Sequence, residues 1–104
     1  MDPFLELSIG GVLIHKTETK DNAGKEPVWN ELVAYEVKDM SLEVFFRVSE
    51  EDNFSNDIVG EGTCTLGDLC QENDTDQSYE IQFEGSSAGT IKLATTFVNF
   101  HAAK

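Results

Sequence analysis

Apolar and polar residues alternate along most of this chain, in short runs that turn-forming residues separate. Alternation at period two is typical of a half-buried β-strand. Short strands at regular spacing are typical of an antiparallel sandwich. We therefore predict an all-β protein, an antiparallel β-sandwich of about seven to eight strands, in one domain over residues 1–104. The alternating runs lie at residues 4–9, 12–19, 29–37, 41–48, 58–66, 78–83 and 90–100.

Turn chemistry divides these runs. Gly10 and Gly11 predict a two-residue hairpin turn. Gly60 and Gly62 interrupt one run and predict a bulge or bend there. Residues 66–70 predict a single helical turn. Loops or turns are expected at residues 21–24, 38–40, 49–57, 71–77 and 85–89, of which 49–57 is a long acidic loop.

The run at residues 29–37 contains the only tryptophan of the chain, Trp29. Pro27 lacks an amide donor, so we expect the strand to begin after it. We interpret Trp29 as a largely buried core anchor rather than an exposed platform for a ligand. Asn30 can bond backbone groups where the strand leaves its loop. Pro27, Trp29 and Asn30 are therefore the predicted structural anchor.

The charge balance limits the partners. The chain has 20 acidic and 7 basic residues, a formal charge of -13. Contacts to phosphates need clustered Lys and Arg, so we exclude nucleic acid. The charge also opposes unaided binding to an anionic membrane. Clustered acids serve hard cations or basic partners, or they form a merely soluble surface, and the composition leaves these alternatives open.

The cysteines and the start of the chain bear on localisation. Cys64 and Cys70 do not have the spacing of a metal site, and we expect free thiols, which fit a reducing compartment. Asp2 and Glu6 stand where a signal peptide has basic residues. No apolar run reaches membrane-spanning length. We expect a cytoplasmic protein that meets membranes only peripherally.

The sequence offers no convincing combination of catalytic residues, and we do not expect an enzyme. His15 and His101 lie at the ends of predicted strands, in solvent. Neither thiol has a sequence signature of an activated thiolate. The glycines form no phosphate-binding loop, because Gly10 and Gly11 join two strands rather than open a helix.

The order of motifs resembles the C2 domain family, the calcium- and phospholipid-binding β-sandwich modules. The resemblance covers nearly the whole chain. Its most specific parts are Pro-x-Trp-Asn-Glu at residues 27–31 and Asp-x-x-Gly at residues 57–60, at the right separation. The matching segments are Asp2-Pro-Phe-Leu-Glu-Leu7, Glu26-Pro-Val-Trp-Asn-Glu31, Leu42-Glu-Val-Phe-Phe-Arg-Val48, Asn56-Asp-Ile-Val-Gly-Glu61 and Gly89-Thr-Ile-Lys-Leu93.

The resemblance implies a calcium site made by two loops. Asp2 matches one ligand of the family's first loop, and Asp57 matches the later aspartate of its third loop. Ser49 and Glu51 fall on the Asp-x-Asp of the third loop, so one carboxylate is replaced by a hydroxyl. Ca²⁺ takes six to eight oxygens, so such a site would be weak. The implied metal ligands are Asp2, Glu51 and Asp57, with Glu50 and Asp52 nearby.

Phe54 stands inside a polar segment at the predicted tip of the third loop. Either it contacts a membrane, as apolar loop-tip residues do in membrane-binding members of the family, or it folds back on its own loop. Two functions remain open. The first is a module that docks to membrane phospholipid with weak Ca²⁺ dependence, in signalling or trafficking. The second is a calcium-independent protein-interaction module with a degenerate calcium site.

The family's usual first strand has no counterpart in this sequence. In the family that strand is central to one sheet, so its absence would leave unpaired backbone on both neighbours. We expect that the chain is a fragment of a larger protein, that residues 95–104 or another chain, such as a second copy in a homodimer, fill this place, or that the sheet closes around the gap.

Overall fold

Six of the alternating runs form strands in a computed structural model, which describes residues 2–20, 27–52, 54–71 and 76–96. All neighbouring strands are antiparallel, so the all-β antiparallel prediction is confirmed, with six strands in the described part instead of seven to eight. The elements are β1 (Pro3–Ile9), β2 (Val12–Lys16), β3 (Glu43–Glu51), β4 (Asn56–Thr65), α1 (Leu66–Leu69), β5 (Asp76–Phe83) and β6 (Ser86–Ala94).

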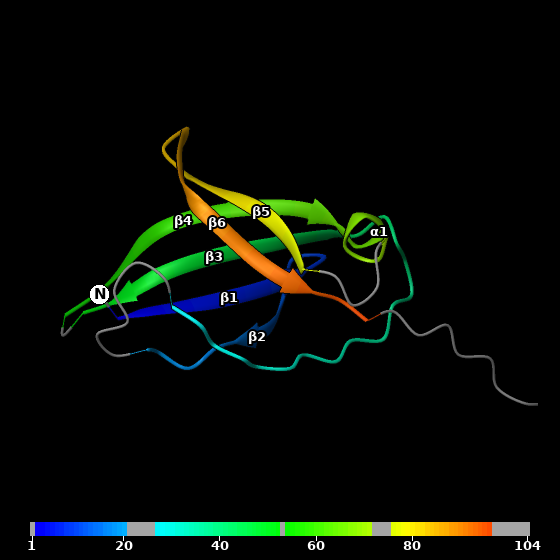
Figure 1. Cartoon of the computed structure of the whole chain (residues 1–104), viewed down its shortest axis with the longest axis horizontal. Coiled ribbons are helices and arrows are strands. Elements are labelled where there is room, and N and C mark those ends of the chain that lie inside the picture. Colours follow the sequence, from blue (N-terminus) through cyan, green and yellow to red (C-terminus); the bar gives the residue numbers. More distant parts are fainter. Residues whose placement is uncertain (1, 21–26, 53, 72–75, 97–104) are drawn as a thin grey trace, which may run out of the picture.

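The strands lie in the order β2-β1-β3-β4-β5-β6, and this sheet folds over itself. β4 and β5 share only one paired position, Glu61 with Gln82. Beyond it β5 and β6 cross over β3 and β1 and form a second layer (Figure 1). No position between two of these strands is empty, and the two edges of the described sheet are β2 and β6.

The core lies between the two layers. In β3 the alternation turns Val44, Phe46 and Val48 inward, and Phe46 is fully buried. The Phe46 ring lies 5.5 Å from the ring of Tyr79 on β5, so it joins the layers. The buried core consists of Leu5, Ile9, Val44, Phe46, Val48, Leu66, Ile81 and Ile91.

The predicted turn at Gly10 and Gly11 is confirmed. Their φ angles are 58° and 82°, the left-handed values that a two-residue turn between twisted strands needs. The turn expected at residues 85–89 is wrong in position, because Glu84 and Gly85 make it and Ser86 already pairs with Phe83. The run expected at 90–100 accordingly forms a strand over 86–94, and residues 97–100 lie outside the described part.

The glycines of β4 mark its close contact with β5. Along β4 the pairing skips Val59, so the bulge expected near Gly60 is present. A Cβ on Gly62 would lie 2.5 Å from the carbonyl oxygen of Glu80, which no real side chain tolerates. The helical turn expected at residues 66–70 is also present, as α1, with Thr65 capping its first turn.

The long acidic loop expected at residues 49–57 is mostly strand. β3 continues to Glu51 and β4 begins at Asn56, and these two residues pair. Glu50 also pairs with Pro3 of β1, so the backbone of β3 has a partner on each side. Main-chain pairing on both sides outweighs the polar composition that predicted a loop.

The strand expected at residues 29–37 is wrong. Residues 27–38 have no ladder partner in the described structure, and only the residues at positions 27, 29, 33 and 37 are half-buried. Val33 and Val37 are half-buried, whereas Leu32 is 94% exposed. A strand needs a neighbour to receive its backbone hydrogen bonds. The described strands do not offer one here.

The predicted anchor is realised only in part. Trp29 packs against the core but is half-buried rather than largely buried. Its indole Nε1 is the one buried side-chain nitrogen or oxygen of the described residues without a hydrogen-bond partner. Pro27 is half-buried, and Asn30 is exposed with a φ of 47°, a conformation that Asn tolerates better than most residues.

Replacing Trp29 tests this packing. We expect Trp29→Ala to lower the free energy of unfolding by about 2–4 kcal/mol, less than a fully buried Trp would cost. Trp29→Phe should stay within about 1 kcal/mol of the wild type, because it keeps much of the packing and removes an unpaired buried donor. Urea unfolding followed by circular dichroism measures both. Leu32→Ala is the exposed control, and a Trp29→Ala loss no larger than its loss would contradict the anchor.

Candidate functional site

Three strands bring acidic residues to one end of the sheet. Glu50 near the end of β3 pairs with Pro3 of β1 and with Asp57 of β4. The amide of Glu51 donates to the carbonyl of Asp2 at 2.9 Å, which fixes the start of the described chain beside β3. Strand register therefore gathers carboxylates that lie far apart in the sequence.

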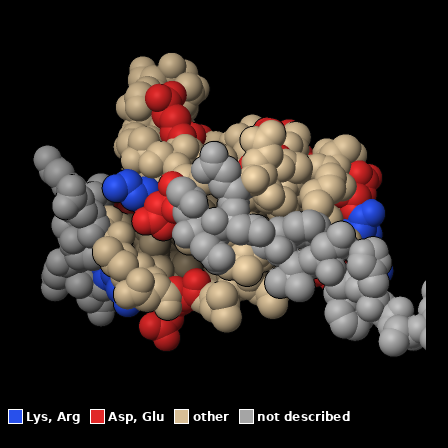
Figure 2. All heavy atoms as spheres, turned by 45° about the vertical axis from the view of Figure 1, so that its right-hand side comes forward, with Lys and Arg blue, Asp and Glu red and all other residues tan. Residues whose placement is uncertain are grey.

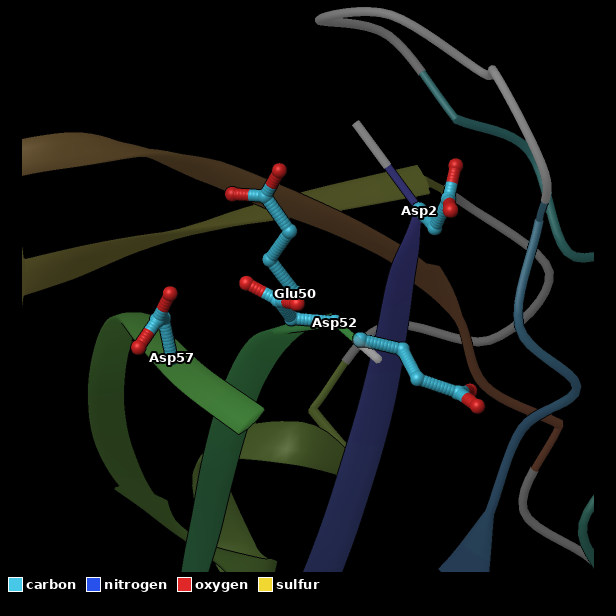
Figure 3. Close-up of a pocket in the computed structure, with 5 residues that line it drawn as sticks. Asp2, Glu50, Asp52 and Asp57 are labelled. Atoms are coloured by element: carbon cyan, nitrogen blue, oxygen red, sulfur yellow. The ribbon is translucent and has the colours of Figure 1, made fainter. Parts of the chain in front are cut away.

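Five acidic residues line one hollow of about 270 Å³ at this end. We call it the acidic hollow. Figure 3 shows it with four of its residues labelled: Asp2 just before β1, Glu50 on β3, Asp52 just after β3 and Asp57 near the start of β4. The sequence nominated all five residues as metal ligands, and the structure places them around the same space. The acidic hollow is lined by Asp2, Glu50, Glu51, Asp52 and Asp57.

The carboxylates of the acidic hollow do not converge on one point. Glu50 and Glu51 are adjacent on β3, and successive strand residues point to opposite faces. The Glu51 carboxylate accepts a hydrogen bond from the Thr19 hydroxyl. In Figure 3 Glu50 and Asp57 lie on one side of the opening and Asp2 on the other.

The side chains around the acidic hollow have the donor atoms that calcium prefers, but they are not arranged as a metal site. All the donors are oxygens, which a hard cation prefers. Within the described ranges, however, no three His, Cys, Asp or Glu side chains form a group that would hold a metal ion. Ser49 is only 3% exposed and pairs with Phe4 of β1. It therefore adds no carboxylate at the position where the C2 resemblance implies one.

Phe54 projects from the same end of the molecule. It is 97% exposed at the tip between β3 and β4. The amide of Asp52 donates to the carbonyl of Ser55 at 3.0 Å and closes the tip around it. The alternative that Phe54 folds back on its loop is wrong, because a ring packed on the loop would lose much of its exposure.

Negative charge is not confined to the acidic hollow. On the face in Figure 2, Asp and Glu side chains recur from the projecting β5–β6 turn to the far end, and Lys and Arg form small separate spots. One of the cations, Lys16, lies over the Phe4 ring with its Nζ 4.6 Å from the centroid. Arg47 pairs with Glu61 across β3 and β4 at 2.7 Å.

The two cysteines and His15 are the other side chains that could act as nucleophiles or bases. Burial raises the pKa of Cys64 to about 11, so its thiol is protonated at neutral pH and a weak nucleophile. Burial also raises the pKa of Cys70. The Nε2 of His15 lies 2.8 Å from the Glu31 carboxylate. His101 lies outside the described residues.

Glu31 ties residues 27–38 to the sheet. Its carboxylate accepts a hydrogen bond from the amide of Glu18 at 3.0 Å and contacts His15. The Glu18 amide, and then the His15 ring, hold the pKa of Glu31 below its usual range. The sequence had nominated neither His15 nor Glu31 for this contact, because residues 16 positions apart carry no local signal.

Comparisons with known proteins agree with this architecture. A family model described as the C2 domain matches residues 1–81. A solved structure titled "Structure of a C2 domain" is 15% identical and superposes with a TM-score of 0.66, covering 88% of this chain and 75% of that chain. At this identity the likeness shows the fold alone. No curated protein matches the sequence. Among the described residues no helix is long and apolar enough to cross a membrane.

The lowered pKa of Glu31 gives a pH-dependent contribution to stability. The contribution is complete above about pH 4.3, the ordinary pKa of glutamate, and is lost as the pH falls through the lower pKa of the folded state. We expect the urea midpoint of Glu31→Gln to lie below that of the wild type at pH 7 and to approach it near pH 3. Glu36→Gln is the matched control on the same segment. A Glu31→Gln difference that does not shrink in acid would contradict this role.

Proposed function

Because this chain belongs to the C2 domain family, we propose that it is a binding module that docks to phospholipid membranes through the end that carries the acidic hollow and Phe54. Domains of this family are in general binding modules rather than enzymes. The docking depends weakly on Ca²⁺. The proposed location is the cytoplasm, with peripheral attachment of the protein to a membrane.

One observation carries the proposal: the five carboxylates of the acidic hollow and the exposed Phe54 ring belong to the same end of the sheet. A ring that is 97% exposed gains by entering a membrane interface, where aromatic side chains are favoured. The carboxylates repel an anionic lipid surface unless their charge is reduced. Bound Ca²⁺ would reduce that charge and accept lipid phosphate oxygens as further ligands.

The chain's own residues divide this task. The candidate ligands are Asp2, Asp52, Asp57 and Glu50, and a cation would meet only some of them at once because they lie on different sides of the acidic hollow. Glu51 contributes less, because its carboxylate already accepts the Thr19 hydroxyl. Phe54 supplies apolar contact and is positioned by the closed tip between Asp52 and Ser55.

Calorimetric titration with Ca²⁺ tests the cation site. We expect weak binding that falls on the order of tenfold or more in Asp57→Asn, because each carboxylate adds strongly to calcium affinity. Asp68→Asn is the matched control, since Asp68 is exposed on α1, at the opposite end of β4. Equal losses at the two positions would mean diffuse attraction of counter-ions rather than coordination.

Co-sedimentation with phosphatidylserine-phosphatidylcholine vesicles tests the docking. We expect Phe54→Ser to weaken vesicle binding on the order of five- to tenfold, because the substitution removes the apolar area that the Phe side chain would bury in the membrane interface. Leu13→Ser is the control, because Leu13 is 54% exposed near the other end of β1. Binding that survives Phe54→Ser, or that Leu13→Ser reduces as strongly, would refute this docking mode.

A second candidate is a calcium-independent protein-interaction module. The engaged Glu51 carboxylate and the buried Ser49 favour it, because both remove ligands from the cation site. A flat calcium titration together with an absence of vesicle binding, for a folded protein, would select this second function over the first.

A further inference from the structure

A second hollow lies where β5 crosses β4. Its volume is about 340 Å³, and its lining combines one aromatic ring with polar side chains. The strands that form it, β3, β4 and β5, are all interior in the strand order, so the hollow does not depend on what pairs with the outer strands. We call it the crossing hollow, and it is lined by Phe45, Glu61, Gly62, Thr63, Glu80 and Gln82.

Strand register places the polar lining on the solvent face of the sheet. Glu61 pairs with Gln82 across β4 and β5. Glu80 lies two residues before Gln82 and therefore shares its face of β5. Ile81 stands between them, is 4% exposed and belongs to the core. The three polar side chains therefore point away from the core, to a side that a partner can reach.

One cation of the chain already uses this chemistry. The guanidinium carbon of Arg47 lies 5.4 Å from the centroid of the Phe45 ring. The Nε of Arg47 donates to Oε2 of Glu61 at 2.7 Å. The same ring and the same carboxylate line the crossing hollow. The chain itself thus shows that a guanidinium is held here by a ring face together with a carboxylate.

Glu80 has no such cation. Its carboxylate accepts a hydrogen bond from the neutral side-chain amide of Gln82 at 2.8 Å. No ion pair among the described residues includes Glu80. The lining therefore has two carboxylates against the one neighbouring guanidinium of Arg47, and its formal charge is negative. This charge selects a cationic group as the occupant.

We propose that the crossing hollow binds an arginine side chain of a partner polypeptide. Its guanidinium would pair with Glu80 and share Glu61 with Arg47, since a carboxylate can accept several hydrogen bonds. Arginine suits the lining better than lysine, because its planar head donates to two acceptors at once and stacks on a ring. Its apolar stem would lie against the half-buried Phe45.

The source of the arginine is a polypeptide rather than a small molecule. Thr63, Glu80 and Gln82 at the rim are exposed, so the residues that flank an arginine have room on this face. The crossing hollow shares no residue with the acidic hollow and needs no calcium. The inference therefore goes beyond membrane docking, and a failure of either proposal leaves the other standing.

The probe is the capped peptide Gly-Gly-Arg-Gly-Gly, titrated into the ¹⁵N-labelled chain in the presence of a calcium chelator. We expect weak, saturable binding that shifts the amide signals of residues 45–47, 61–63 and 80–82 and leaves those of residues 50–52 unchanged. The same peptide with citrulline for arginine keeps the shape and loses the charge, and should bind at least tenfold more weakly. The lysine peptide should bind about threefold more weakly.

Charge removal locates the contact. Glu80→Gln should weaken binding of the arginine peptide on the order of three- to fivefold. Glu43→Gln is the matched control and should change it less than twofold, because Glu43 is exposed on β3 but does not line the crossing hollow. Arg47→Gln should tighten binding about threefold, because it removes the internal competitor for Glu61. Lys38→Gln, which removes one exposed positive charge elsewhere, should have less than half that effect.

Three results would overturn the proposal: equal binding of the citrulline peptide, equal losses in Glu80→Gln and Glu43→Gln, or amide shifts confined to the acidic hollow. Titration with free argininamide separates the two sources of the guanidinium. We expect it to bind at least threefold more weakly than the peptide. Equal binding would assign the crossing hollow to a small cation and would also overturn the proposal.

Discussion

The close crossing of β4 by β5 is the constraint on which the rest of the structure depends. A single sheet encloses a core only if it folds over itself, and here the fold occurs where Glu61 pairs with Gln82. Gly62 allows the Glu80 carbonyl to approach its Cα closer than any side chain would permit. This approach carries Ile81 and Ile91 over Phe46 and closes the core.

The candidate site follows from backbone register rather than from attraction between its side chains. Paired backbones in β1, β3 and β4 bring five carboxylates together although these repel one another. The pleat of β3 then points neighbouring acids to opposite faces, which limits the repulsion and also the number of ligands that one cation meets. The same geometry therefore explains both why the hollow is acidic and why few of its carboxylates can meet at one point.

The end with the acidic hollow and the β2 edge differ in chemistry. The end with the acidic hollow presents charge beside an exposed ring, which suits a surface whose phosphates a cation can bridge. At the β2 edge, Glu31 instead makes contacts that stabilise the fold.

The sequence by itself determined six of the seven alternating runs as strands, the turn at Gly10 and Gly11, the bulge near Gly60 and the set of acids around the hollow. These depend on local conformation, or on positions that the resemblance to C2 domains aligned. Only the tertiary structure decided that residues 29–37 form no strand, that Trp29 is half-buried and that β3 runs on to Glu51. The physical reason is the same in each case. Alternation reports which side chains face the core, whereas a strand also requires a neighbouring backbone, and only the folded arrangement supplies or withholds one.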